Sequence, residues 1–110
     1  MATFEDFMNL DIRAGEIVKA EKFLRARKPA YKVWVDFGKD VGILATSAQI
    51  TVQYKPEDLP GKKVLGLINI GSRNIAGFSS EFLLLGLPDE QGVIHLAGYD
   101  HGSVKGARLC

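Results

Sequence analysis

The sequence contains little cysteine and no long apolar run. Its 110 residues include one cysteine, Cys110, so no intrachain disulfide and no thiolate metal cluster can form. No apolar stretch approaches the roughly 20 residues that cross a bilayer. Residues 1–10 mix acidic with aromatic side chains, unlike a signal peptide. We therefore expect a cytoplasmic protein that is not attached to a membrane.

Motifs of catalytic and metal sites are also missing. Residues 61–63 lack the upstream glycine of a phosphate-binding loop, and neither G-x-S-x-G nor G-x-G-x-x-G occurs. The serines have no His and Asp partners in a pattern typical of nucleophilic catalysis. His95 and His101 have no third ligand at a zinc-like spacing, which favours ordinary strand and loop positions. We expect no catalytic residue, no metal and no cofactor.

Neither sign of charge dominates the chain as a whole, but the charges are unevenly distributed. The 14 basic and 13 acidic residues give a net charge of +1, and 46% hydrophobic residues are typical of one globular domain. Residues 22–39 contain six basic residues and a single acid, Asp36, for a local charge of +5. This run indicates either a solvated basic loop or a contact for nucleic-acid phosphates.

Short apolar segments predict a small β-barrel. Strands are expected at residues 12–23, 33–37, 41–45, 64–70, 82–85 and 93–96. A Thr3 cap with Asp6 three residues later predicts a helix within residues 1–10, and Gly15 predicts a bulge or a sharp coil in the first strand. The order fits an all-β OB fold, a five-stranded Greek-key barrel over residues 11–110 with a short N-terminal helix and a C-terminal extension.

Two of the predicted strands are apolar on both faces. These are residues 64–68 and 82–85, whereas a barrel wall needs only its inner face to be apolar. A contiguous apolar patch is rarely left in water, so either the terminal segments or a second subunit must cover the outer face. We favour a homodimer, which residues 1–10 help to stabilise, with more than roughly 1,000 Å² of buried surface.

A polar segment, residues 69–81, joins these two strands. It offers one guanidinium, two amides, three hydroxyls and several glycines, and it contains no acid before Glu81. Such a composition is typical of a polar connector or of a ligand loop. Arg73 can neutralise a phosphate or stack on a base, and Asn69, Asn74 and Ser80 can hydrogen-bond RNA bases or 2′-hydroxyls. In an OB fold this segment lies near the loop after the first strand, which adds Arg25, Arg27 and Lys28.

Motifs over nearly the whole chain resemble those of the tRNA-binding domain family. They are Asp11-Ile12-Arg13-Ala14-Gly15-Glu16-Ile17, Val35-Asp36-Phe37-Gly38, Thr46-Ser47-Ala48-Gln49-Ile50-Thr51, Asn69, Arg73, Ile75-Ala76-Gly77-Phe78 and Ser80-Glu81. Within the family, the Ile-Ala-Gly-Phe-x-Ser-Glu run, the Ser-Ala-Gln-Ile stretch and the connector Tyr54-Lys55-Pro56-Glu57 are most similar to the CsaA-like dimers, which are described as chaperones for exported proteins.

The resemblance implies an OB barrel that forms a two-fold dimer, binds the outer corner of tRNA by shape and needs no cofactor. It places RNA contacts on Asn69, Arg73, Ser80 and Glu81. Similar dimers tend to carry two prolines and two basic residues where this chain has Gly-Ser-Arg-Asn at 71–74, and often a lysine at Ser79. Two positive charges are thus missing there, and the loop at residues 25–28 supplies others.

A second hypothesis is a chaperone that binds unfolded precursor polypeptides in apolar grooves beside the dimer seam. The aromatic candidates for such grooves are Phe4, Phe7, Phe78, Phe82 and Trp34. In a small barrel, however, aromatic residues more often belong to the core or to an interface. Salt distinguishes the two functions, because apolar binding of a polypeptide is insensitive to salt and phosphate binding is not.

Overall fold

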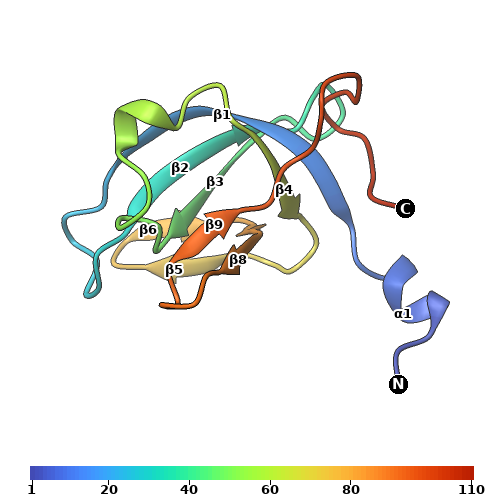
Figure 1. The fold of residues 1–110 in the computed structure, drawn as a ribbon, viewed down its shortest axis with the longest axis horizontal. Coiled ribbons are helices and arrows are strands. Elements are labelled where there is room, and N and C mark those ends of the chain that lie inside the picture. Colours follow the sequence, from blue (N-terminus) through green and yellow to red (C-terminus); the bar gives the residue numbers. More distant parts are fainter.

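The computed structural model describes residues 1–110 and contains a nearly closed β-barrel with one small helix (Figure 1). The elements are α1 (Phe4–Met8), β1 (Ile12–Lys22), β2 (Tyr31–Asp36), β3 (Ile43–Ala48), a 3-10 helix (Pro56–Asp58), β4 (Lys63–Leu67), β5 (Arg73–Ile75), β6 (Phe78–Ser80), β7 (Leu83–Leu84), β8 (Gly86–Pro88) and β9 (Ile94–Leu96). Five strands form an antiparallel sheet in the order β3-β2-β1-β4-β7, and β5–β6 and β8–β9 are hairpins. The predicted all-β OB fold with an N-terminal helix is confirmed.

The core lies on the inner face of the curved sheet, where alternate side chains point inward. In β2, Tyr31, Val33 and Val35 are buried, whereas the residues between them are half-buried on the outer face. Phe37 and Phe82 meet edge to face at the centre of the core, with ring centroids 5.0 Å apart. The inner face therefore supplies the packing, and the outer face is available for other contacts.

The barrel closes where the segment after β6 meets the edge of β3. Glu81 N donates to Ala45 O at 2.7 Å, and Ala45 N donates to Glu81 Oε1 at 2.9 Å. Ser47 N donates to Ser80 Oγ at 3.1 Å. These bonds satisfy backbone groups that an open sheet edge would leave unpaired.

The bend in β1 lies at Val18, so the predicted bulge at Gly15 is wrong. The register of β1 against β2 shifts between Ile17 and Lys19, whereas Gly15 pairs regularly with Val64. A Cβ atom at Gly15 would lie 2.5 Å from Val35 Cγ1. Glycine occupies this position because a core side chain approaches the backbone closely.

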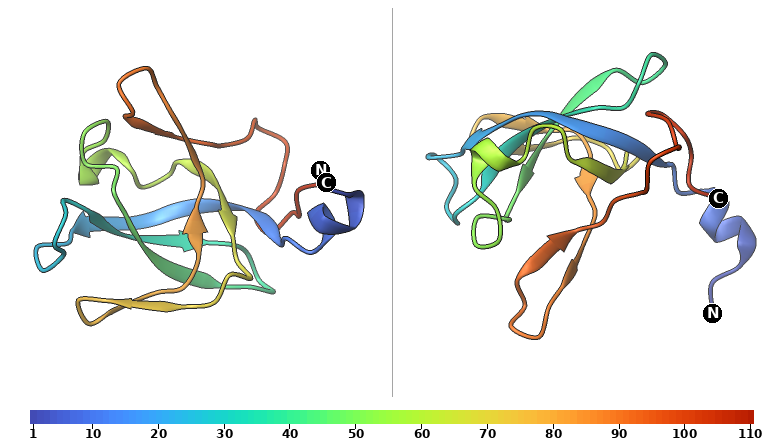
Figure 2. Two further views of the ribbon diagram at one scale, coloured as in Figure 1. Left: turned by 90° about the horizontal axis from the view of Figure 1, so that it is seen from below. Right: turned by 45° about the horizontal axis from the view of Figure 1, so that its top comes forward.

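Two segments differ from the sequence prediction. Residues 69–81, predicted as a connector, contain the hairpin β5–β6. The predicted strand at residues 82–85 forms only a two-residue strand, β7, after which β8 leaves the sheet and pairs with β9. This second hairpin projects away from the barrel (Figure 2).

The two ends of the chain lie on the same side of the barrel, where α1 projects from it (Figures 1 and 2). The predicted cap is present, with Asp6 N donating to Thr3 Oγ1 at 3.1 Å and Thr3 N donating to Asp6 Oδ2 at 2.9 Å. Arg108 Nη2 donates to Met8 O at 2.6 Å and links the C-terminal segment to the helix. No residue of α1 is buried, so the helix itself adds nothing to the barrel core.

The C-terminal segment runs along the edge of β4. Leu65 N donates to Ala97 O at 3.2 Å, and the Tyr99 hydroxyl donates to Gly15 O at 3.2 Å. Leu83 nevertheless remains exposed. The terminal segment therefore pairs with the edge of β4 and leaves Leu83 of β7 uncovered. No helix in the structure combines the length and apolar character of a membrane span.

Candidate functional site

The basic loop, residues 23–30, connects β1 to β2 at the end of the barrel away from α1 (Figure 1). Phe23 N donates to Ala30 O at 3.0 Å and Ala26 N donates to Phe23 O at 3.2 Å, which fixes the loop. Arg25, Arg27 and Lys28 are exposed. The six ion pairs of the structure all use other cations, so the charges of this loop have no carboxylate partner.

Hairpin β5–β6 faces this loop and turns tightly between Ile75 and Phe78. Ala76 and Gly77 both have positive φ, 49° and 86°, as a two-residue hairpin turn of type I′ requires. Asn74 Oδ1 accepts a hydrogen bond from Gly77 N at 2.9 Å. The side chain of Asn74 therefore shapes the turn.

An aromatic cluster holds the hairpin against the outer face of the sheet. The Phe78 ring packs edge to face on Phe23 and on Trp34, with centroids 5.4 and 5.9 Å apart. Lys32 Nζ lies 5.0 Å from the ring centroids of both phenylalanines, a favourable cation–π distance. This packing brings the hairpin tip to the basic loop, because a Cβ atom on Gly77 would lie 3.8 Å from Arg25 Nη1.

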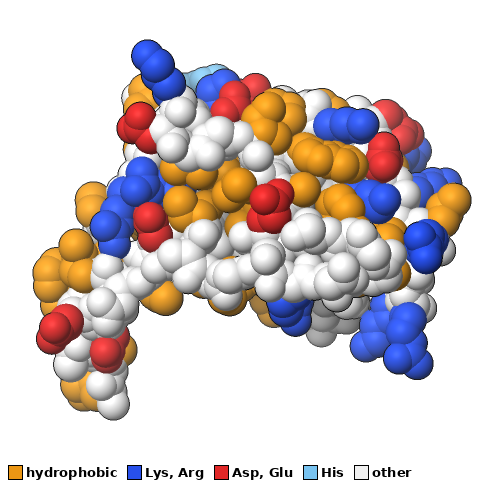
Figure 3. All heavy atoms as spheres, turned by 180° about the vertical axis from the view of Figure 1, so that it is seen from behind, with side chains coloured by type: hydrophobic (Ala, Val, Ile, Leu, Met, Phe, Trp, Pro, Cys, Tyr) orange, Lys and Arg blue, Asp and Glu red, His pale blue; other side chains and the backbone are white.

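The basic loop and the hairpin border a hollow of about 780 Å³, which we call the basic hollow. Its lining residues are Ala26, Arg27, Lys28, Ala30, Ser47, Gln49, Arg73, Asn74, Ile75 and Ala76. Three cations, two amides and a hydroxyl line this surface, and no acid does. Figure 3 shows lysine and arginine side chains gathered at the end of the molecule away from α1. Such a lining suits an anionic backbone that also offers hydrogen-bonding groups.

The structure brings four of the eight predicted RNA-binding residues together in this hollow. Arg27, Lys28, Arg73 and Asn74 line it, and Arg25 lies beside the hairpin tip. The prediction that the loop after the first strand and the segment at residues 69–81 face each other is therefore consistent with the geometry. Whether these side chains bind RNA stays a prediction.

The other three predicted residues have partners within the fold. Asn69 Oδ1 accepts from Asp11 N at 3.0 Å, and its Nδ2 donates to Asn9 O at 2.8 Å. Ser80 is 7% exposed and its Oγ lies 3.1 Å from Thr46 Oγ1. The Glu81 carboxylate holds β3, as described above. These polar atoms fasten α1 and close the barrel and do not line the basic hollow, and their RNA contacts stay a prediction.

Ser47 and Gln49 line the basic hollow but were not among the candidate residues. Ser47 is half-buried near the end of β3, and Gln49 follows this strand and is exposed. Strand β3 buries the adjacent residues Ala45 and Thr46, so its pattern does not alternate and carries no signal for these two positions. The predicted strand also ended at Ala45, whereas β3 continues to Ala48.

The five aromatic candidates for a polypeptide groove lie in three separate places. Phe82 is 3% exposed in the core, so its predicted place in a groove is wrong. Phe78 and Trp34 belong to the aromatic cluster on the outer face. Phe4, 77% exposed, and Phe7 lie on α1 with their centroids 6.5 Å apart. Core packing and fixation of the hairpin explain three of the five residues.

A second hollow of about 400 Å³, the apolar hollow, adjoins the basic hollow at Arg73. The two hollows share Ser47, Gln49 and Arg73. The apolar side chains that line it are Ala48, Ile50, Leu83, Leu84, Leu85, Ile94 and Leu96. Arg73 thus stands between a polar and an apolar surface.

The carboxyl groups with shifted pKa values belong to ion pairs. The Arg13 guanidinium lowers the pKa of Asp11, and Arg108 adds to this effect. The Gly38 backbone N–H and the Lys105 ammonium lower the pKa of Asp36, and His95 lowers that of Asp89. No group of three or more His, Cys, Asp or Glu side chains is arranged to hold a metal ion.

Comparison with known proteins gives consistent matches. Residues 12–108 match the family model described as a putative tRNA binding domain. A methionine–tRNA ligase of Christiangramia forsetii is 34% identical over 105 residues, which are 96% of this chain but only 15% of the ligase. The structure of the chaperone CsaA of Bacillus anthracis superposes with a TM-score of 0.92 at 41% identity and covers 100% of this chain and 99% of that one. The CsaA chaperone of Picrophilus torridus gives 0.92 at 38% identity, with 100% of both chains covered.

Proposed function

Because this chain belongs to the putative tRNA-binding domain family, we propose that it binds tRNA through the basic hollow, in the cytoplasm, without catalysing a reaction. The observation that carries the proposal is the lining of this hollow, where Arg27, Lys28 and Arg73 converge without a carboxylate partner. Cations that pair with no acid in the protein are available for phosphates. The matched methionine–tRNA ligases are several times longer than this chain, so we propose RNA binding alone and not aminoacylation.

A salt titration of tRNA binding tests this proposal. Each phosphate contact contributes a log-log slope of roughly −0.7 to −0.9, so Arg25, Arg27, Lys28 and Arg73 together predict a slope near −3. Arg73→Ala should flatten the slope by the share of one contact. It should weaken binding by about 1–3 kcal/mol if the guanidinium also contacts a base, and by less if it contacts phosphate only.

The matched control for this titration is Lys39→Ala. It removes one positive charge from the turn at the other end of β2, away from the basic hollow. Affinity and slope should stay near the wild-type values. The basic hollow is not the RNA site if the wild-type protein binds tRNA independently of salt. The same conclusion follows if Arg73→Ala has the same affinity and salt slope as Lys39→Ala.

We also propose that the protein forms a homodimer through the side that carries α1. The helix spans five residues and none is buried, although Phe4, Met8 and Leu10 are exposed there. Figure 3 shows apolar side chains on this projecting segment. Helices this short are marginal in water without packing, so a second copy is the cover we favour. Sedimentation equilibrium tests this, and a 12.0 kDa species that persists at micromolar concentrations would contradict it.

A second candidate function is the binding of unfolded polypeptides, which the apolar hollow beside Arg73 favours. Similarity to the CsaA chaperones agrees with this function. Burial of apolar side chains is not screened by salt, so suppression of aggregation should persist at moderate salt. Its loss at moderate salt, with the fold intact, would indicate an effect of charge and not of the apolar hollow.

A further inference from the structure

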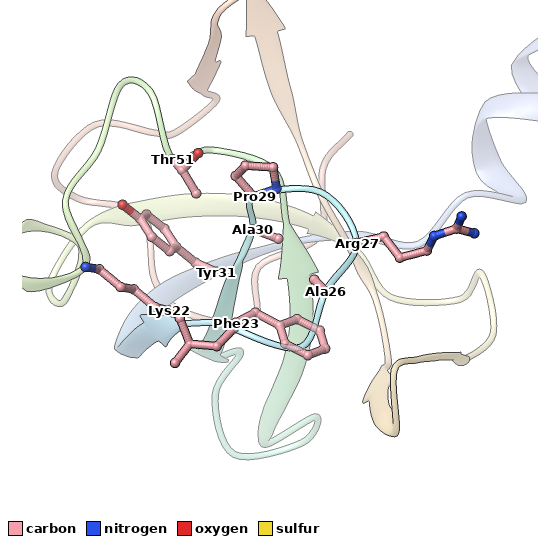
Figure 4. A pocket seen from close by; sticks show the side chains of 9 residues that line it. Lys22, Phe23, Ala26, Arg27, Pro29, Ala30, Tyr31 and Thr51 are labelled. Atoms are coloured by element: carbon pink, nitrogen blue, oxygen red, sulfur yellow. The ribbon is translucent and has the colours of Figure 1, made fainter.

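The basic loop has a second side, which borders a pocket that the proposed function does not use. This pocket of about 390 Å³, which we call the loop pocket, lies between the loop, the end of β1 and Thr51. Its volume is within the range of about 300–1,000 Å³ that is usual for small-molecule sites. Figure 4 shows Tyr31 and Thr51 beside the loop, with the Arg27 guanidinium pointing away from them.

The loop pocket combines an apolar lining with a cationic edge. The buried side chains of Phe23 and Tyr31 contribute its inner wall. Leu24 contributes an outer wall and is 87% exposed, so nothing in the chain covers it. Lys22 and Arg27 stand at the edge, and neither takes part in an ion pair. The pocket therefore suits a ligand with an apolar body beside a negative charge.

The loop pocket and the basic hollow share part of their lining. Ala26, Arg27 and Ala30 border both spaces. The Arg27 stem borders the loop pocket, and its guanidinium is directed away from that pocket. One ligand can therefore contact both surfaces by passing across the loop, provided that a short link joins its anionic and apolar parts.

We propose that the loop pocket receives one unpaired base of the RNA whose phosphates contact the basic hollow. A nucleotide joins a largely apolar ring to an anionic phosphate, which matches the lining and its edge. Bases that are free of a duplex are the ones that proteins surround with aromatic and apolar side chains. This inference rests on the proposed RNA binding and specifies the RNA feature that is recognised, an unpaired base next to the bound backbone.

Thr51→Phe tests the proposal by filling the pocket. Thr51 lines the loop pocket but takes no part in the hydrogen bond at its inner wall, which joins the Tyr31 hydroxyl to Tyr54 O. The substitution therefore adds volume without removing a charge or that bond. Val52→Phe is the matched control, because it adds the same side chain at an adjacent residue that is 81% exposed and outside the pocket. Both variants are titrated with tRNA and with a blunt, fully paired RNA duplex, and circular dichroism checks the fold.

Thr51→Phe should weaken tRNA binding about five- to hundredfold, the effect of losing one base–aromatic stack. Its salt slope and its affinity for the duplex should equal those of the wild type, as should all values for Val52→Phe. Leu24→Ala removes the exposed wall without a change in charge and should cause a smaller loss for tRNA alone. This second variant gives the answer if Thr51→Phe does not fold.

Several results would overturn the inference. If Thr51→Phe and Leu24→Ala fold and bind tRNA as tightly as the wild-type protein does, the inference is wrong and the proposed function stays intact. The inference is also wrong if Thr51→Phe loses the same affinity for tRNA and for the duplex, or if it loses polypeptide binding while its RNA binding is unchanged. Failure of the wild-type protein to bind tRNA would overturn the proposed function, and with it this inference.

Discussion

The two ends of the barrel use their basic side chains in opposite ways. Near the chain termini, Arg13 pairs with Asp11 and also donates to Gly106 O at 3.0 Å, and Lys105 Nζ donates to Asp36 Oδ2 at 3.0 Å. At the basic hollow, Arg27 and Lys28 are exposed and form no ion pair. One set of cations is already bound within the protein, and the other is free to bind a ligand.

This contrast shows why net charge is a poor guide to function here. The whole chain carries only +1, yet ion pairs remove Arg13, Lys105 and Arg108 from competition for phosphates. A ligand at Arg13 would have to displace Asp11, whereas a ligand at Arg27 displaces only water and salt ions. The arrangement of partners, more than the number of cations, determines which end is available to an anion.

Removal of the unpaired cations should give the largest effect. A triple variant, Arg25→Ala, Arg27→Ala and Lys28→Ala, should reduce the tRNA salt slope from near −3 to near −1, because about 0.7–0.9 log units per contact are lost. If the variant and the wild-type protein bind tRNA equally at 1 M salt, this change of slope makes the variant about 100- to 500-fold weaker than the wild type at 0.1 M salt. The urea midpoint should not change, because these side chains support nothing in the fold. A large stability loss would mean that the two ends do not differ as described.

The reverse experiment removes a paired cation. Arg13→Ala takes away a charge-assisted contact to Asp11 and the bond to Gly106 O, and we expect a loss of about 1–3 kcal/mol in unfolding free energy. Affinity of the folded variant for tRNA should remain at the wild-type value. Urea unfolding and a tRNA titration measure the two quantities. If Arg13→Ala weakens RNA binding and leaves the unfolding free energy unchanged, Arg13 serves RNA binding and not the fold, and the assignment of the two ends is reversed.

Acid should produce the smallest effect, and of the two barrel ends it should act only at the terminal end. The folded pKa values of Asp11 and Asp36 lie below the ordinary value of 3.8. Their stabilisation is therefore present above that value and is lost as the pH falls through the folded pKa. Urea midpoints should decrease below about pH 5, and Asp36→Asn should flatten this decrease. Arg27→Ala should follow the wild-type curve, and a flattened curve for that variant would contradict the comparison.

The barrel was predictable from the sequence because its long strands show clear patterns. Strand β2 alternates buried and half-buried residues along its whole length. Hairpin β5–β6 was not predictable, because strands of three residues are too short to show alternation. Its turn also needs Ala76 at a positive φ of 49°, which residues other than glycine rarely adopt.

The site was predictable in its charges but not in its polar contacts. Exposed arginines and lysines in one run of sequence indicate a basic surface wherever the chain folds. The partner of a loop amide or hydroxyl depends instead on distant residues, such as Asn9 and Asp11 for Asn69, 60 and 58 positions away. Ser80 likewise meets Ser47, 33 positions away. Sequence alone cannot distinguish a side chain that binds a ligand from one that fastens the fold.

The aromatic cluster also gives the molecule a built-in optical reporter. Trp34 is the only tryptophan, and its ring touches Phe78 of the hairpin and lies 4.8 Å from the Lys19 ammonium. Indole emission depends on its immediate surroundings, so a movement of hairpin β5–β6 relative to the sheet should change it. Stopped-flow fluorescence of the unlabelled protein can therefore follow hairpin displacement in real time, separately from the circular dichroism of the barrel.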